Sequence, residues 1–146
     1  MFGVWQWFEG WCSTCASPET PIATLMGERP IADLRVGDLV YSVHERAVTA
    51  VPIGRVSSTP VRDRRVVRLS LSNGATLQIS PGHPTADGRS FRELVAGDLL
   101  DAQHEVLSAE FVPYSHERTY DILPNSTTAT YFAAGALVGS TLHGAR

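Results

Sequence analysis

The two cysteines of the chain, Cys12 and Cys15, lie three positions apart and form a Cys-x-x-Cys pattern. Such a pair is typical of a redox-active dithiol or of half a zinc site. A zinc site would need two further ligands, and the sequence contains neither a second cysteine pair nor a His-x-x-His pattern. A thioredoxin-like dithiol would need a strand–helix–strand unit around it, which the sequence does not predict. We therefore expect no metal and no cofactor.

Other side chains that could do chemistry are spread along the chain. His83 lies in a Pro-Gly-His-Pro turn, and Asp121 follows a tyrosine in a predicted strand. Taken alone, Cys15 would be a small buried apolar residue, His83 a turn residue and Asp121 one half of an ion pair at a strand end. We expect His104 to be exposed on a polar connection and the other histidines to be ordinary surface residues (His44, His116 and His143).

Length and composition indicate one globular domain. The chain has 146 residues, of which 43% are hydrophobic and 18% charged, and this is enough to bury a core without disulfides. A formal net charge of -3 argues against nucleic acid or an anionic membrane as a partner. The basic run (Arg62, Arg64, Arg65 and Arg68) is better explained as a solvated strand edge than as a phosphate site.

The segment that contains residues 1–11 is apolar and aromatic, but it has no basic beginning and no small-residue cleavage site. A secretory signal requires both of these missing features, so we do not expect one. No apolar run approaches the length of a membrane span. Because two cysteines cannot form a disulfide framework, we expect a cytoplasmic protein. We also expect it to be a monomer.

The clearest structural pattern is a β-hairpin over residues 65–80. With a three-residue loop at Ser72-Asn73-Gly74, the apolar residues of the two strands fall on one face as cross-strand pairs (Leu71 with Ala75, Leu69 with Leu77, and Val67 with Ile79). Gly74 would supply the left-handed turn residue. A two-residue Asn-Gly turn would misalign these faces, so we predict the longer loop.

The sequence also contains an internal repeat. Residues 29–40 and 89–100 align without gaps at an offset of 60, with five identical pairs (Arg29/Arg89, Leu34/Leu94, Gly37/Gly97, Asp38/Asp98 and Leu39/Leu99). We interpret them as two copies of one supersecondary unit rather than two unrelated Gly-Asp turns. Short strands are expected over 20–25, 38–44, 48–57, 65–72, 75–80, 98–101, 105–113, 118–123 and 130–139, with single helical turns near 31–34 and 91–94. The fold class is therefore all-β.

Three blocks together resemble the Hedgehog/intein (Hint) autoprocessing domains. The first begins at Cys15 and continues through Thr20, a Gly-x-x-Pro-Ile turn and a Gly-Asp-Leu-Val strand (Gly27, Pro30, Ile31, Gly37 and Asp38). The second, Ser80-Pro81-Gly82-His83, is similar to the family's Thr-x-x-His. The third opens with Tyr120-Asp121, and Gly135 precedes its last strand. The resemblance covers residues 15–141 and implies a pseudo-twofold β horseshoe. It divides the chain into a leader (1–14), a Hint domain (15–141) and a short tail (142–146).

The resemblance implies that the chain cleaves itself, so that its own N-terminal segment is the substrate. Cys15 would attack the carbonyl of Thr14 and convert the peptide bond into a thioester. His83 would protonate the leaving nitrogen as general acid, and Ser80 would orient this region through its hydroxyl. Asp121 matches an acidic position that in inteins tunes the cysteine and couples the reactions at the two ends of the domain.

The sequence departs from the family in two places. Splicing inteins end in His-Asn before a Cys, Ser or Thr, whereas this chain has Gly139-Ser140 followed by Thr141. Serine has no carboxamide that could cyclise, so we expect no complete splicing. The aspartate with which Hedgehog-type domains transfer the thioester to a sterol aligns with Ser57, or with Asp63 if a gap is allowed. We therefore expect water or a small thiol, rather than a sterol, to resolve the thioester.

Two alternatives stay open at this point. The domain could be a catalytically silent Hint scaffold that binds a partner through its aromatic leader. Cys12 could form a disulfide with Cys15 and thereby regulate it, or it could be an incidental residue of the segment to be released.

Overall fold

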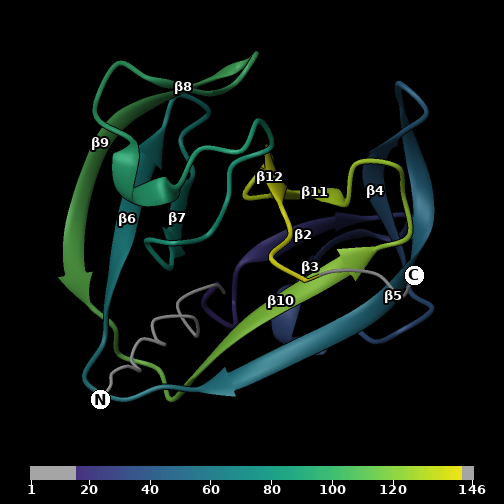
Figure 1. Ribbon diagram of the computed structural model, residues 1–146, viewed down its shortest axis with the longest axis horizontal. Helices are drawn as coiled ribbons and strands as arrows, with labels where there is room; N and C mark the ends of the chain where they lie inside the picture. Colours follow the sequence, from purple (N-terminus) through teal and green to yellow (C-terminus); the bar gives the residue numbers. More distant parts are fainter. Residues whose placement is uncertain (1–15, 143–146) are drawn as a thin grey trace.

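In the computed structural model the described residues are 16–142, so Cys12, Thr14, Cys15 and His143 lie outside them. The regular elements of this part of the chain are strands apart from two single helical turns, which confirms the all-β prediction (Figure 1). The strands are β2 (Pro21–Thr24), β3 (Gly27–Pro30), β4 (Leu39–His44), β5 (Ala47–Pro60), β6 (Arg65–Leu71), β7 (Thr76–Ile79), β8 (Leu99–Asp101), β9 (His104–Pro113), β10 (Arg118–Pro124), β11 (Thr130–Ala133) and β12 (Ala136–Gly139). Single helical turns lie at η1 (Ile31–Asp33) and η2 (Phe91–Glu93). Within residues 16–142 there is no helix that could cross a membrane.

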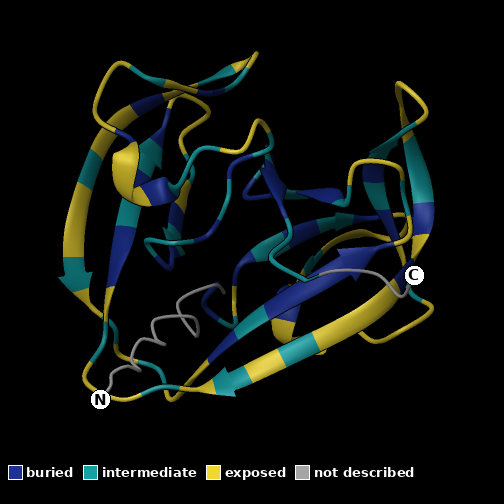
Figure 2. Cartoon of the chain, in the orientation of Figure 1, coloured by how far each residue is buried: buried dark blue, intermediate teal, exposed yellow. Residues whose placement is uncertain are grey.

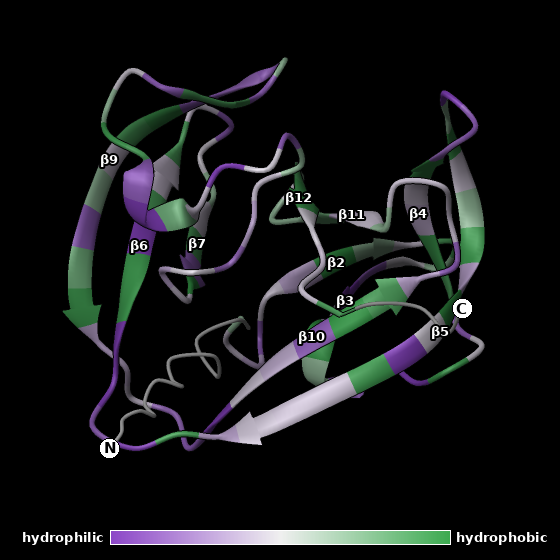
Figure 3. Cartoon of the chain, viewed as in Figure 1, coloured by the Kyte–Doolittle hydropathy of each residue, from purple (hydrophilic) through white to green (hydrophobic). Residues whose placement is uncertain are grey.

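The strands form two sheets that curl around a shared core. One sheet runs in the order β10-β5-β4-β2-β11-β12, with β3 paired to β2, and the other runs β7-β6-β9-β8. In Figure 1 the long β5 and β10 lie beneath one lobe, and β6, β7 and β9 form the other lobe. Figure 2 shows that β10 is mostly buried while the second half of β5 faces solvent. Apolar residues, green in Figure 3, occur on strands of both sheets, and the buried ones form one cluster.

The hairpin over β6 and β7 has the predicted register. Val67 pairs with Ile79 and Leu69 with Leu77, and the N–H of Leu71 donates to the carbonyl of Ala75. Gly74 has a φ of +88°, which is the left-handed conformation that the three-residue loop requires. Five of the six apolar side chains on this face are buried, and Ala75 packs against them.

The internal repeat is a structural repeat. In each copy a single helical turn is followed by a glycine with positive φ, +95° at Gly37 and +98° at Gly97. The carboxylate of Asp38 accepts a hydrogen bond from the N–H of Arg35, and that of Asp98 accepts one from the N–H of Val95. Because the residue types and the hydrogen bonds both repeat, the two units are copies of one supersecondary motif.

The repeat extends further than the ungapped alignment indicates. The N–H of Ala32 in η1 donates to the carbonyl of Pro18, and the N–H of Arg92 in η2 donates to the carbonyl of Pro81. In the same way the N–H of Thr20 donates to the carbonyl of Ser17, and the N–H of His83 donates to the carbonyl of Ser80. Thus Ser-Pro-Glu-Thr (17–20) is the counterpart of Ser-Pro-Gly-His (80–83). The offset here is 63 instead of 60, because the second copy is three residues shorter before its helical turn.

Two elements differ from the expectations. The polar segment Gly27–Pro30 forms β3, although its mostly exposed residues carry no alternation that would predict a strand. Residues 130–139 form two strands, the pair that the Hint resemblance implies, and not one. The chain reverses between β11 and β12 at Ala134 and Gly135, both of which have positive φ, as a tight two-residue hairpin requires.

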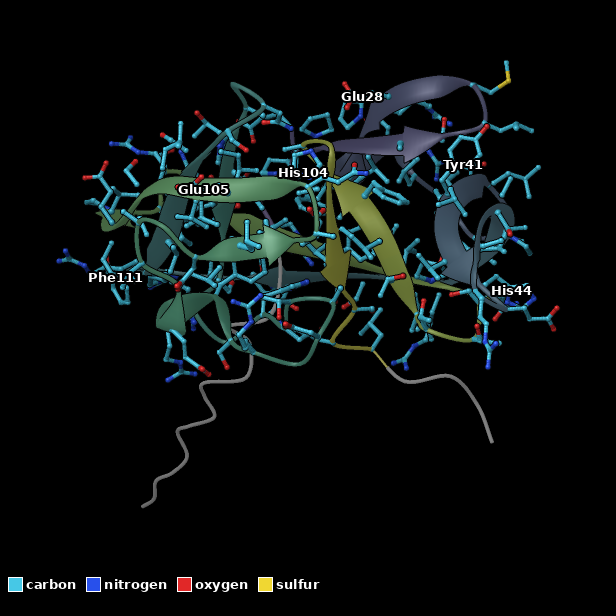
Figure 4. All side chains as sticks on the ribbon, turned by 90° about the horizontal axis from the view of Figure 1, so that it is seen from above. Glu28, Tyr41, His44, His104, Glu105 and Phe111 are labelled. Carbon is cyan, nitrogen blue, oxygen red and sulfur yellow. The ribbon has the colours of Figure 1, made fainter. Side chains whose placement is uncertain are left out.

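His104, labelled in Figure 4, is only partly exposed, contrary to the expectation. Its side chain is 17% exposed, and Nδ1 lies 2.8 Å from Oδ1 of Asp101. The other oxygen of Asp101 accepts the N–H of Leu137 in β12 at 2.8 Å. Burial raises the pKa of Asp101, but hydrogen bonds from Leu137, Gln103 and His104 lower it more, so this pKa lies below its ordinary 3.8. The pair therefore connects the β8–β9 hairpin to β12.

We expect Asp101→Asn to lower the free energy of unfolding at pH 7 by about 1–2 kcal/mol, since a charged acceptor of three hydrogen bonds is lost. A carboxyl whose pKa is lower in the folded state stabilises the fold above its unfolded value of 3.8 and loses this contribution as pH falls through the folded value. Urea unfolding at pH 7 and pH 3 should therefore show a difference in unfolding free energy between the two proteins that is smaller at pH 3 than at pH 7. Asp33→Asn, at an exposed position, is the control, and an equal gap at both pH values would contradict the prediction.

Candidate active site

His83 is held by the turn that precedes it. Its N–H donates to the carbonyl of Ser80 at 3.1 Å, and its own carbonyl accepts the N–H of Phe91 at 3.0 Å. Both the His83 and the Ser80 side chains are fully buried. The Ser-Pro-Gly-His segment therefore presents the imidazole to the interior of the molecule, and not to solvent as an ordinary surface turn would.

The orientation of the His83 ring is defined by the end of β12. Nε2 lies 2.7 Å from the carbonyl oxygen of Gly139. A carbonyl oxygen can only accept, so Nε2 carries a hydrogen and Nδ1 is the ring nitrogen that can gain or release a proton. The rings of Phe91 and Tyr131 contact the imidazole edge-on, with centroids 6.0 and 6.5 Å away. The fold thus leaves one defined nitrogen for proton transfer.

Asp121 lies at the centre of a second group of contacts. It is 1% exposed, and its Oδ1 accepts the Tyr131 hydroxyl at 2.6 Å and the N–H of Ile122 at 2.9 Å. Its Oδ2 accepts both the N–H of Thr141 at 2.9 Å and the Thr141 hydroxyl at 2.5 Å. All four donors are neutral, so the interpretation of Asp121 as half of a strand-end ion pair is wrong.

Tyr131 was not predicted as a site residue, yet it connects the two groups. Its hydroxyl oxygen lies 2.6 Å from Oδ1 of Asp121 and 3.5 Å from Nε2 of His83. One signal was available in the sequence, a tyrosine within a predicted strand, because a tyrosine hydroxyl needs a polar partner wherever such a strand is buried. The identity of that partner depends on contacts between distant segments.

Ala16 places the beginning of the described chain beside these residues. It exchanges two backbone hydrogen bonds with Tyr120, of 2.7 and 2.8 Å, and also bridges to Ile79. Tyr120 precedes Asp121, and Ile79 precedes Ser80. Cys15 is joined to Ala16 by one peptide bond, which spans about 3.8 Å between Cα atoms. Thr14, Cys15 and Cys12 lie outside the described residues, so their predicted roles stay predictions.

The end of β12 is closely packed around Gly139. A Cβ at this position would lie 3.0 Å from the carbonyl oxygen of Thr85 and 3.4 Å from the ring of Pro84. Backbone oxygen cannot move aside easily, so a larger side chain here would displace the segment that follows His83. Gly139, which stands where splicing inteins have histidine, therefore packs closely against Pro84 and Thr85.

A cavity of about 260 Å³ lies next to Asp121 (lined by Ile31, Ala32, Leu34, Val56, Ser57, Ser58, Tyr120 and Asp121). Ser57 is the cross-strand partner of Asp121 in the β5–β10 pair. Asp63 lines a different cavity together with Pro81 and Gly82. Of the two positions that the Hedgehog alignment offers, Ser57 is thus the one beside Asp121. Among residues 16–142 no group of three or more His, Cys, Asp or Glu side chains could hold a metal.

The remaining histidines are as predicted where the structure describes them. His44 and His116 are partly exposed and lie 3.7 and 3.1 Å from surface glutamates. His143 lies outside the described residues. These side chains belong to the surface and not to the site around His83.

Neither protein-family models nor curated protein sequences match the chain. Solved structures do. The gp41-1 intein superposes with a TM-score of 0.68 at 19% identity over 86% of this chain and 98% of that one. The fold of this chain is therefore the fold of an intein.

The chain has the Hint fold.

Two further structures agree. The Msm DnaB1 intein splicing domain, solved with zinc bound, has a TM-score of 0.72 at 16% identity and covers 86% of this chain and 99% of that one. A bacterial intein-like domain from Clostridium thermocellum has a TM-score of 0.72 at 19% identity, covering 87% and 97%. At such identities the likeness establishes the Hint fold, and the chemistry of this chain has to be argued from its own residues.

Proposed function

We propose that this Hint domain cleaves its own chain between Thr14 and Cys15. The observation that carries the proposal is the position of Ala16, which pairs with Tyr120 between the segments that present Asp121 and His83. The residue joined to Ala16 is the one cysteine that the Hint pattern requires. Buried ionisable groups that gather at the end of such a cysteine-bearing segment are typical of catalytic sites.

The first step forms a thioester. The Cys15 thiolate sulfur attacks the Thr14 carbonyl carbon through a five-membered ring, so the reacting atoms are held together by the chain itself. The bond between that carbon and the Cys15 nitrogen then breaks. His83 delivers a proton from Nδ1 to the departing nitrogen, while Nε2 stays bound to the Gly139 carbonyl. The products are a thioester on Cys15 and its free amino group.

The second step releases the leader. Water or a small thiol attacks the thioester carbon, the bond to the Cys15 sulfur breaks, and that sulfur takes up the proton. Residues 1–14 leave as an acid or as a new thioester, and residues 15–146 remain with cysteine at their beginning. Because the nucleophile belongs to the substrate chain, each molecule reacts once. Ser140 cannot cyclise as asparagine does, so the reaction ends without splicing.

Ser80 and Asp121 support this chemistry in different ways. Ser80 is fully buried in the turn that ends at His83, and its hydroxyl would orient the backbone around the scissile bond. Asp121 accepts two hydrogen bonds from Thr141. The carboxylate therefore holds Thr141, which follows β12, against β10. Ala16 pairs with Tyr120 on the same strand, so the two ends of the domain lie close together.

The proposal is tested by incubating the purified full chain with dithiothreitol and measuring intact masses over time. Appearance of a fragment that begins at Cys15 supports cleavage. A chain that stays full-length favours the alternative, a silent Hint scaffold that binds a partner through its aromatic leader.

Cys12 leads to a redox prediction. A Cys12–Cys15 disulfide would consume the nucleophile, so reduction would have to precede cleavage. We expect a phosphine reductant, which does not resolve the thioester as a thiol does, to increase the rate of hydrolytic cleavage in protein purified without reductant. Cys12→Ser should cleave at the higher rate with or without reductant. Equal rates for the unmodified chain under both conditions would show that Cys12 is incidental.

A further inference from the structure

The hydroxyl of Tyr131 is fixed in direction by Asp121. Tyr131 is fully buried on β11, and its oxygen lies 2.6 Å from Oδ1 of Asp121. A phenol has a single hydrogen, and at this short distance it is directed at the carboxylate. Toward any other neighbour, the Tyr131 oxygen can therefore only accept a hydrogen bond.

The neighbour on the other side is the imidazole of His83. Its Nε2 lies 3.5 Å from the Tyr131 oxygen and 2.7 Å from the Gly139 carbonyl. The hydrogen on Nε2 thus has one close acceptor and a second, more distant one. The resulting chain has one direction, from Nε2–H to the Tyr131 oxygen and from the Tyr131 hydroxyl to the Asp121 carboxylate. Such chains polarise each of their members when they are buried.

Within residues 16–142, the contacts of the imidazole include the Phe91 ring of η2, the Tyr131 ring and hydroxyl of β11, and the Gly139 carbonyl of β12. Phe91 is apolar and the carbonyl is neutral. The carboxylate of Asp121 on β10, reached through Tyr131, is therefore the ionisable group linked to the ring by these contacts.

We propose that Tyr131 is a positioning residue whose hydroxyl links the Asp121 carboxylate to His83 and thereby stabilises the protonated imidazole. The inference rests on the proposed function, in which a protonated His83 is the general acid. No proton has to move through Tyr131. Its hydroxyl holds the Asp121 carboxylate in place, and the hydrogen bond to that carboxylate makes the Tyr131 oxygen a better acceptor for Nε2–H.

The test follows the imidazole directly and does not need cleavage. In Cys15→Ala protein, the ring signals of His83 are followed by NMR from pH 5 to 8.5, with and without Tyr131→Phe. We expect the pH midpoint of the transition to fall by about half a unit or more in Tyr131→Phe, since the imidazolium loses an acceptor linked to a negative charge. Tyr41→Phe on β4, labelled in Figure 4, is the matched control and should leave the midpoint unchanged.

A second arm distinguishes positioning from packing. In the cleaving chain we expect Tyr131→Phe to slow thiol-induced cleavage about tenfold, and to have less than a twofold effect in an Asp121→Asn background. An unchanged midpoint, an imidazole that does not respond to pH in either protein, or equal losses in both backgrounds would overturn the inference. Absence of cleavage in the unmodified chain would instead contradict the proposed function, while a shifted midpoint would still support the role of Tyr131.

Discussion

Cys15→Ala is expected to abolish release of the leader. Alanine has no group that can attack the Thr14 carbonyl, and the spontaneous hydrolysis of a peptide bond is negligible over hours. The residue that follows, Ala16, keeps its hydrogen bonds to Tyr120 through backbone atoms alone, so the substitution should leave the fold intact. The variant should therefore stay full-length on a denaturing gel after incubation with a thiol.

Two further variants make this expectation specific. Cys15→Ser keeps a nucleophile, but its hydroxyl is hardly ionised at neutral pH, so slow cleavage through an ester is expected. Cys12→Ala removes the neighbouring sulfur and should cleave at the rate of the fully reduced chain. If Cys15→Ala is cleaved after Thr14 as fast as the unmodified chain, Cys15 is not the nucleophile.

His83→Ala is expected to slow cleavage by about 10²–10⁴-fold, the usual contribution of a general acid. The substitution also removes the donor to the buried Gly139 carbonyl, so part of any loss could arise from a weakened fold. His83→Gln keeps an N–H donor in the same region but cannot deliver a proton at neutral pH. It should be nearly as slow as His83→Ala and closer to the unmodified chain in thermal stability.

The control for His83 is His44→Ala. His44 is partly exposed and accepts the N–H of Thr127 near the surface, so its loss should leave the cleavage rate unchanged. Rates are compared by intact mass after addition of one thiol at fixed pH. A His83→Gln chain that cleaves as fast as the unmodified one would show that His83 is a structural residue.

The local parts of this structure could be predicted because their signals are local. Alternation of apolar residues and Gly74 determine the β6–β7 hairpin and its register. The two Gly-Asp corners share the hydrogen bonds that their shared residues imply. In both cases the residues that decide the conformation lie within a few positions of one another, so a single sequence contains the information.

Contacts between distant segments could not be predicted in this way. The Tyr131 hydroxyl donates to the carboxylate of Asp121 on another strand, and the Thr141 hydroxyl, which lies beyond β12, donates to the same carboxylate. His104 is covered because its partner Asp101 binds the backbone of β12. The correspondence of residues 17–20 with 80–83 was hidden by a three-residue difference in length, which only the repeated hydrogen bonds reveal.

Whether Cys15 forms a thioester can be determined by trapping it with hydroxylamine in the purified full chain and identifying both products by mass spectrometry. We expect two species, residues 1–14 with a hydroxamate on Thr14 and residues 15–146 with a free amino-terminal cysteine. A chain that remains intact in hydroxylamine, or that is cut at any other bond, would contradict the formation of this thioester.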